Sequence, residues 1–110
     1  MSGADRDDGW DAETLRLGTL YTWAELLKDG PLPDRAAVDF EFVGTGAAQP
    51  MPFTLWLRMR GLAAEGDASA LKATTGEIDL SAEAVADLEA ELAEGAAGYG
   101  YAPDGWGFAG

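Results

Sequence analysis

Residues 36–43 alternate between apolar and charged side chains, and this pattern constrains the fold more than any other feature of the sequence. In order, the alternating residues are Val38, Asp39, Phe40, Glu41 and Phe42. Successive side chains of a β-strand point to opposite faces of its sheet, so the pattern predicts a strand with one buried and one solvated face. The buried face must pack against another layer, and two helical segments of the chain are the candidates.

The first helical segment is residues 11–29. Asp11 is placed to cap its N-terminus, and Gly30-Pro31 ends it. The expected core-facing positions, at helical spacing, are Leu17, Leu20, Tyr21, Ala24 and Leu27. Trp23 and Leu26 lie on a second face and widen the apolar stripe, which indicates either deep burial or an edge that faces a partner.

The second helical segment, residues 81–94, is the clearest amphipathic helix, with Ser81 as its N-cap and Gly95 after its last residue. The residues expected to face the core are Val85, Leu88 and Leu92. The opposite side carries the acids Glu83, Asp87, Glu91 and Glu94. No Lys or Arg interleaves them, since the chain from residue 73 to its end has eight acids and no base. This acidic side is either an ordinary solvated face or a surface that attracts a basic partner.

Residues 53–60 fit two different structures. The apolar residues at alternate positions are Phe53, Leu55, Leu57 and Met59. This alternation predicts a strand that forms a hairpin with the first strand through a loop at residues 44–52. The alternative is a helix that begins at Pro52 and ends at Gly61. Of the two, we expect the strand.

The C-terminal segment combines aromatic residues with glycine. Tyr99 and Tyr101 precede a predicted turn at Pro103-Asp104-Gly105, and Trp106 and Phe108 follow it. Aromatic side chains on glycine-flanked strands need support from something bulky. Either a helix of the protein supplies that support, or the rings form an exposed platform, since Trp and Tyr are common interface anchors.

These patterns predict one α+β domain over residues 10–110, after a mobile tail of residues 1–9 that lacks large apolar side chains. The expected antiparallel sheet of about four strands is covered by the two helices 11–29 and 81–94. Its strands are residues 36–43, 53–60, 69–75 and the C-terminal aromatic segment.

Composition narrows the function. The 110 residues include 20 Asp and Glu but 7 Lys and Arg, which gives a formal net charge of −13. We therefore expect a basic or neutral partner, and we expect the chain to bind neither nucleic acid nor an anionic membrane. Histidine and cysteine are absent, which removes the commonest general base, thiolate nucleophiles and most zinc sites. We expect no enzymatic activity, no cofactor and no metal, with Asp79, Glu83 and Asp87 as a weak cation site at most. No leader and no membrane span is recognised, so a cytoplasmic location is expected.

From Ser69 to Gly107 the order of features resembles the C-terminal half of the family of the regulator of ribonuclease E activity, type B. The matching features are the strand Leu71-Lys72-Ala73-Thr74-Thr75, the acidic helix that begins at Ser81, and the sequence Asp104-Gly105-Trp106-Gly107. The resemblance implies a ferredoxin-like α+β fold and a non-enzymatic role, in which an acidic protein binds a ribonuclease and restrains it. It also places a helix on residues 51–62, where the alternation favours a strand, and Pro103 stands where that family usually has tyrosine.

We expect the chain to inhibit or modulate a basic macromolecule, such as a nuclease or another nucleic-acid-binding protein. The expected partner-binding residues are Glu83, Asp87, Glu91, Glu94, Tyr101, Asp104, Trp106 and Phe108. The acids would steer the encounter and the aromatic residues would anchor the complex. The alternatives are a nucleic-acid mimic of the kind that phages use against defence nucleases, and a subunit or assembly factor that packs through Trp23 and Leu26.

Overall fold

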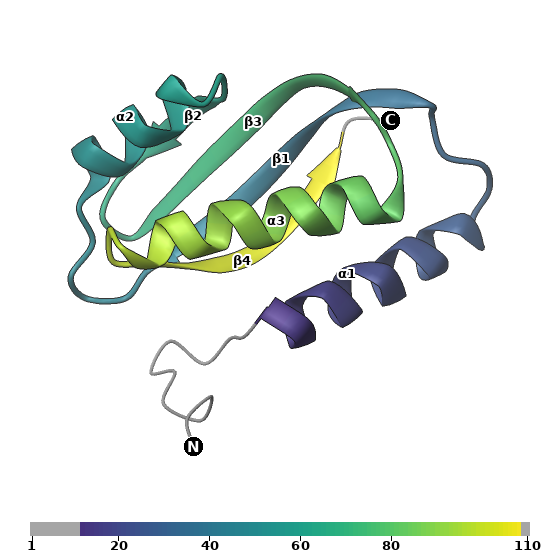
Figure 1. Cartoon of the computed structure of the whole chain (residues 1–110), viewed down its shortest axis with the longest axis horizontal. Helices are drawn as coiled ribbons and strands as arrows, with labels where there is room; N and C mark the ends of the chain where they lie inside the picture. The colour runs from purple at the N-terminus through teal and green to yellow at the C-terminus, as the bar shows by residue number, and fades with distance from the viewer. Residues whose placement is uncertain (1–11, 109–110) are drawn as a thin grey trace.

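The computed structural model describes residues 12–108 (Figure 1). In chain order the elements are α1 (Ala12–Leu27), β1 (Arg35–Gly44), α2 (Pro50–Met59), β2 (Ala63–Gly66), β3 (Ala70–Asp79), α3 (Ala82–Ala97) and β4 (Tyr101–Phe108). The strands form one sheet in the order β2-β3-β1-β4, with all neighbours antiparallel, so the expected α+β class with a four-stranded antiparallel sheet is confirmed. From β1 to β4 the chain follows the β-α-β-β-α-β order of ferredoxin-like folds, with α1 added in front. The expected tail at 1–9 and cap at Asp11 lie outside the described residues.

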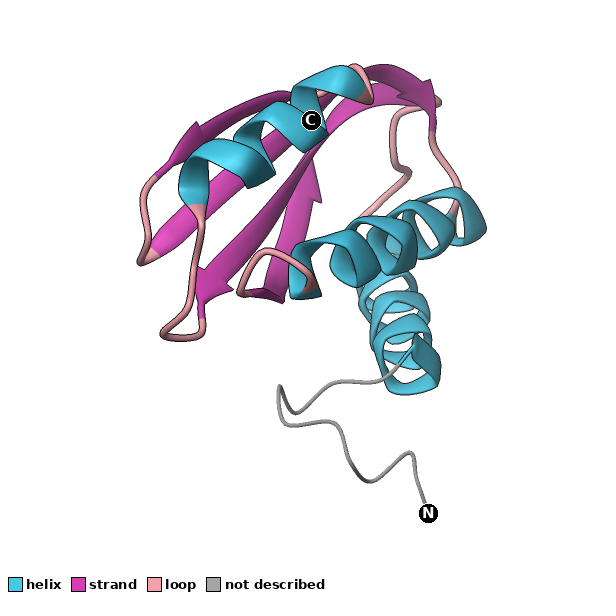
Figure 2. Cartoon of the chain, turned by 60° about the vertical axis from the view of Figure 1, so that its left-hand side comes forward, coloured by secondary structure: helices cyan, strands magenta, loops and turns pink. Residues whose placement is uncertain are grey.

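β1 is a central strand whose apolar side chains enter the core, as its alternation predicts. Helices α2 and α3 lie over the same face of the sheet (Figure 2). The core residues that β1, α2 and α3 bring together there include Val38, Phe40, Phe42, Phe53, Leu57, Val85 and Leu92. On the other face, paired Glu41 and Lys72 are both exposed, and no helix of the described residues covers them. The sheet therefore has one buried and one solvated face.

The strand expected over residues 53–60 is wrong, because this segment is the helix α2. Phe53 and Leu57 are four residues apart, so they share one face in either structure and do not discriminate between them. Leu55 decides the question: in a strand it would join them in the core, whereas in α2 it lies on the opposite side and is 59% exposed. Pro50 and Pro52 fit the first turn of a helix, where backbone N–H groups have no helical partner. The strand that pairs with β3 at this edge is β2, which the sequence pattern missed.

The predicted helix over residues 11–29 is confirmed as α1, but its buried side differs from the expected one. Leu17, Tyr21 and Leu27 are exposed, whereas the second face of the helix, which includes Trp23, packs inward. The reason is the location of α1, which packs beside α3 instead of over the centre of the sheet (Figure 1). It contacts the end of β4 through Trp23, whose ring lies near those of Trp106 and Phe108. The Trp23 ring centroid lies 6.4 Å from that of Trp106.

Two other boundaries differ from the sequence pattern. β3 continues beyond residue 75, where the predicted strand ends, because the beginning of β1 pairs with it as far as Asp79. α3 passes through Gly95 and ends at Ala97, with Gly98 as its C-cap. The absence of a side chain at Gly95 leaves room for the Trp56 ring of α2, which occupies the space that a β-carbon would fill.

Candidate binding site

The acidic row of α3 (Glu83, Asp87, Glu91 and Glu94) is exposed along the outer side of the helix, as expected. Ser81 caps the helix, because its hydroxyl accepts a hydrogen bond of 3.0 Å from the Ala84 backbone N–H. The basic residues that the row lacks in the sequence come from α1 and from the residue that follows α2. In the part of the chain that the structure describes, Glu94 is the one member of the row without an ion pair.

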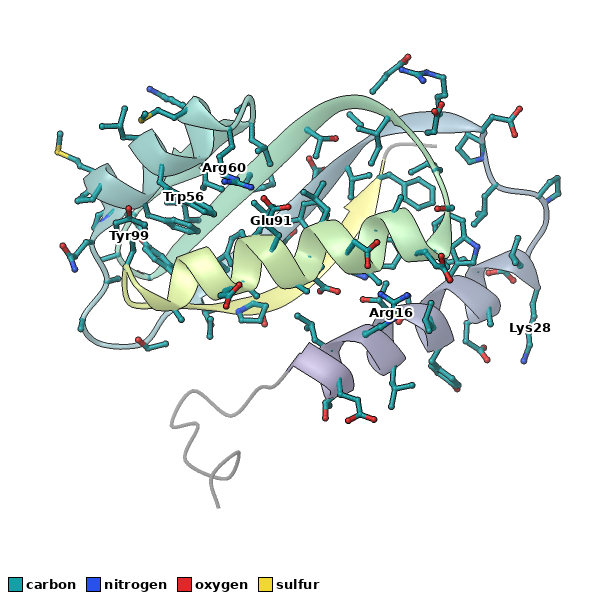
Figure 3. The ribbon with its side chains drawn as sticks, in the orientation of Figure 1. Arg16, Lys28, Trp56, Arg60, Glu91 and Tyr99 are labelled. Atoms are coloured by element: carbon teal, nitrogen blue, oxygen red, sulfur yellow. The ribbon has the colours of Figure 1, made fainter. Side chains whose placement is uncertain are left out.

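Two arginines flank the row (Figure 3). Arg16 of α1 lies 2.7 Å from the Asp87 carboxylate and 3.9 Å from that of Glu83. Arg60, which follows α2, pairs with Glu91, and its guanidinium lies 4.8 Å from the centre of the Trp56 ring. These pairs join α3 to both neighbouring helices and reduce the repulsion within the row. All are at least partly exposed, so each contributes little to stability, on the order of 0–1 kcal/mol.

The C-terminal aromatic residues pack against the protein's own helices. Of the two alternatives that the sequence leaves open, support by a helix therefore describes the structure better than an exposed platform. Tyr101 is 1% exposed, with its ring 4.9 Å from that of Phe53, and its hydroxyl donates a 2.6 Å hydrogen bond to the Asp67 carbonyl. Burial, with a smaller effect from the nearby Asp67 carboxylate, raises the pKa of Tyr101. The expectation that Tyr101 anchors a partner does not fit this buried position.

Trp106 and Phe108 are half-buried against α1, and their rings stack with centroids 6.0 Å apart. Asp104 is exposed at a bulge, where β4 shifts register between its pairings with Glu41 and Phe42. The structure therefore separates the expected binding residues into an exposed acidic row on α3 and a partly covered end of β4. They do not form one platform.

A cavity of about 450 Å³ lies between α1, α3 and the bulge of β4. Its lining includes Gly18 and Thr19 of α1, Glu89 of α3, and Asp104 and Trp106 of β4. The Thr19 hydroxyl donates a hydrogen bond to Glu89, and the Trp106 indole N–H donates one of 3.2 Å to the Thr19 oxygen.

Glu89 is 5% exposed, and this burial raises the pKa of its carboxyl, an effect that the Thr19 hydrogen bond partly offsets. The expected set of binding residues omits Glu89. The burial of Glu89 could have been predicted from the sequence, because Glu89 follows Val85 by four residues and precedes Leu92 by three. This spacing places an acidic side chain on the apolar side of α3.

The chemistry of the surface gives little support for a metal centre. Within residues 12–108, no group of three or more potential ligand side chains is suited to hold a metal ion. Asp79 pairs with Arg35, while Glu83 and Asp87 pair with Arg16.

None of the described helices has the length and apolar character needed to cross a lipid bilayer. In comparisons with known proteins, no family model and no curated protein matches the chain.

Proposed function

We propose that this chain is a non-enzymatic acidic binding protein that inhibits or modulates a basic macromolecular partner. The observation that carries the proposal is the exposed acidic row of α3, in a chain whose acids far outnumber its basic residues. Four of the six Lys and Arg between residues 12 and 108 already form ion pairs with acids of the chain. Exposed acids without such a pair remain both in the row and outside it, among them Asp29, Asp34, Glu41, Glu65, Glu94 and Asp104. A basic surface is the natural complement of this charge distribution.

The α3 row is the part of this surface best suited to meet a partner first. Glu83, Asp87, Glu91 and Glu94 extend along one side of a rigid helix. A row of like charges on a protein of net charge −13 attracts a basic partner over the Debye length, about 8 Å at physiological ionic strength. When the partner's basic residues pair with the row, Arg16 and Arg60 would lose their ion pairs with Asp87 and Glu91. Each arginine could then pair with an acid of the partner, so binding need not leave either cation unpaired.

A ribonuclease is the class of partner that we favour. The resemblance to the family of the regulator of ribonuclease E activity, type B, places a helix on residues 51–62, and α2 occupies Pro50–Met59. The same resemblance implies a ferredoxin-like fold, and the order from β1 to β4 is of that kind. These two agreements support the choice of a ribonuclease over other basic proteins.

Affinity capture from the native lysate tests the proposal with three baits. The first is the wild-type chain, and the second carries Glu83→Lys, Asp87→Lys and Glu91→Lys. The third carries Asp29→Lys, Asp34→Lys and Glu65→Lys, three exposed acids outside the row, so its net charge changes by the same amount. We expect the wild-type and third baits to retain the same basic protein at low salt and release it at high salt, while the second bait retains none. Equal retention by all three, or retention of nothing, would contradict the proposal.

A further inference from the structure

The cavity between α1, α3 and β4 has the composition of a site for a positively charged group. Its lining contains two acids, Glu89 and Asp104, and no Lys or Arg. Glu89 is nearly fully buried, and Thr19 is the single group among the described residues that donates a hydrogen bond to its carboxylate. A carboxylate has room for about four hydrogen bonds. Within residues 12–108, this carboxylate at the cavity wall therefore has one donor for about four acceptor positions.

The cavity also has apolar walls and free space. Trp106 and Leu15 line it, and Gly18 stands where a β-carbon would meet no atom within 4 Å. A glycine inside a helix costs roughly 1 kcal/mol relative to alanine, so a glycine here leaves the space open at the expense of helix stability. The volume of about 450 Å³ falls within the range of sites that bind small organic groups.

We propose that this cavity binds an alkyl guanidinium group, presented as an arginine side chain of the basic partner. The guanidinium would donate hydrogen bonds to Glu89 at the base of the cavity and lie beside Asp104 at its rim, while the alkyl part lies against Trp106. Arginine suits the site better than lysine because its planar group donates to a carboxylate through two N–H groups and stacks on an indole ring. An anion would be repelled by both acids.

This inference deepens the proposed function, because it names the group that the partner inserts beside the α3 row. Burying an ionised carboxylate is costly unless it is paired, so a cation that enters here recovers part of a cost that the free protein bears. The row attracts the partner at a distance, whereas the cavity would select arginine at contact. The two surfaces use different residues of α3 and are separable by mutation.

Titration of the full chain with defined probes tests the proposal. The probes are a blocked Gly-Arg-Gly peptide, the same peptide with neutral citrulline in place of arginine, and free agmatine, a small molecule with the same guanidinium. Binding is followed by the NMR signal of the Trp106 indole N–H, which the Trp106→Phe variant assigns. We expect the arginine peptide to shift this signal and the citrulline peptide to leave it unchanged. Agmatine binding far more tightly than the peptide would overturn the assignment to a partner's side chain.

Two variants remove the site in different ways. Glu89→Gln keeps an acceptor for Thr19 but removes the charge, and Gly18→Leu fills the open space from α1. We expect Glu89→Gln to weaken binding of the arginine peptide by about thirtyfold or more, as loss of one partner of a buried charge pair does. We expect a comparable loss from Gly18→Leu, because its side chain would take the space that the guanidinium needs. Glu65→Gln, which changes an exposed acid outside both the cavity and the α3 row, should bind as the wild type does. The inference is wrong if the wild type does not bind the peptide, or if neither Glu89→Gln nor Gly18→Leu weakens binding. Capture through the α3 row tests the proposed function separately.

Discussion

Gly95→Ala is expected to destabilise the protein, although alanine favours helices. A β-carbon at this position would overlap the outer atoms of the Trp56 ring and lie 2.8 Å from its Cζ3. The ring is not free to move aside, because it stacks on Phe53, contacts Tyr99 and has Arg60 over its face (Figure 3). Overpacking of this kind costs about 1–3 kcal/mol, and the gain in helix propensity offsets at most about 1 kcal/mol of it.

Gly18→Ala is the matched control, because Gly18 also lies inside a helix but a β-carbon there meets open space. It should stabilise the protein by up to about 1 kcal/mol, so the two variants should differ by about 1–3 kcal/mol in the free energy of unfolding. Urea denaturation measures this difference, and thermal melts should separate the variants by roughly 4–8 °C for each kcal/mol. If Gly95→Ala is as stabilising as Gly18→Ala, the close packing of Trp56 on α3 is wrong.

Two further predictions follow from the burial of particular side chains. Burial raises the pKa of Glu89 above its ordinary 4.5, so the folded protein holds this proton more tightly than the unfolded chain does. The free energy of unfolding of the wild type, relative to that of Glu89→Gln, should therefore be constant below pH 4.5. It should fall as the pH rises above 4.5, until the carboxyl of the folded protein has ionised. Urea titrations at a series of pH values measure this difference, and a difference that does not change with pH would show that Glu89 is solvated. Leu57→Ala should cost about 2–5 kcal/mol and Leu55→Ala less than about 0.5 kcal/mol, whereas equal costs in urea denaturation would restore the strand interpretation of this segment.

The sequence predicts best those elements in which one period dominates. β1 alternates at period two, and α3 has its apolar residues three and four apart, so both were expected at nearly their observed positions. In α2, Phe53 and Leu57 satisfy both periods, and the exposed Leu55 makes the alternation look complete. Apolar residues on the outside of a helix therefore misled the prediction at this segment.

The candidate site was predictable only where it lies within one element. The acidic row could be read from α3 alone, but Arg16 is 71 residues from Asp87 and the ion pair between them depends on how α1 docks. The same docking decides which aromatic residues are covered, since Trp23 lies against both Trp106 and Phe108. Periodicity within a segment contains no information on such long-range contacts.

The rate of association with the basic protein recovered by capture tests the central claim most directly. Stopped-flow measurements over a series of salt concentrations would compare the wild type with the two triple-lysine variants. Electrostatic steering by the α3 row predicts a wild-type rate that falls steeply with salt, and a rate at low salt that is about tenfold or more lower in the Glu83, Asp87 and Glu91 variant. The variant of equal net charge at Asp29, Asp34 and Glu65 should remain close to the wild type. An association rate that is the same in all three proteins at every salt concentration would contradict the account.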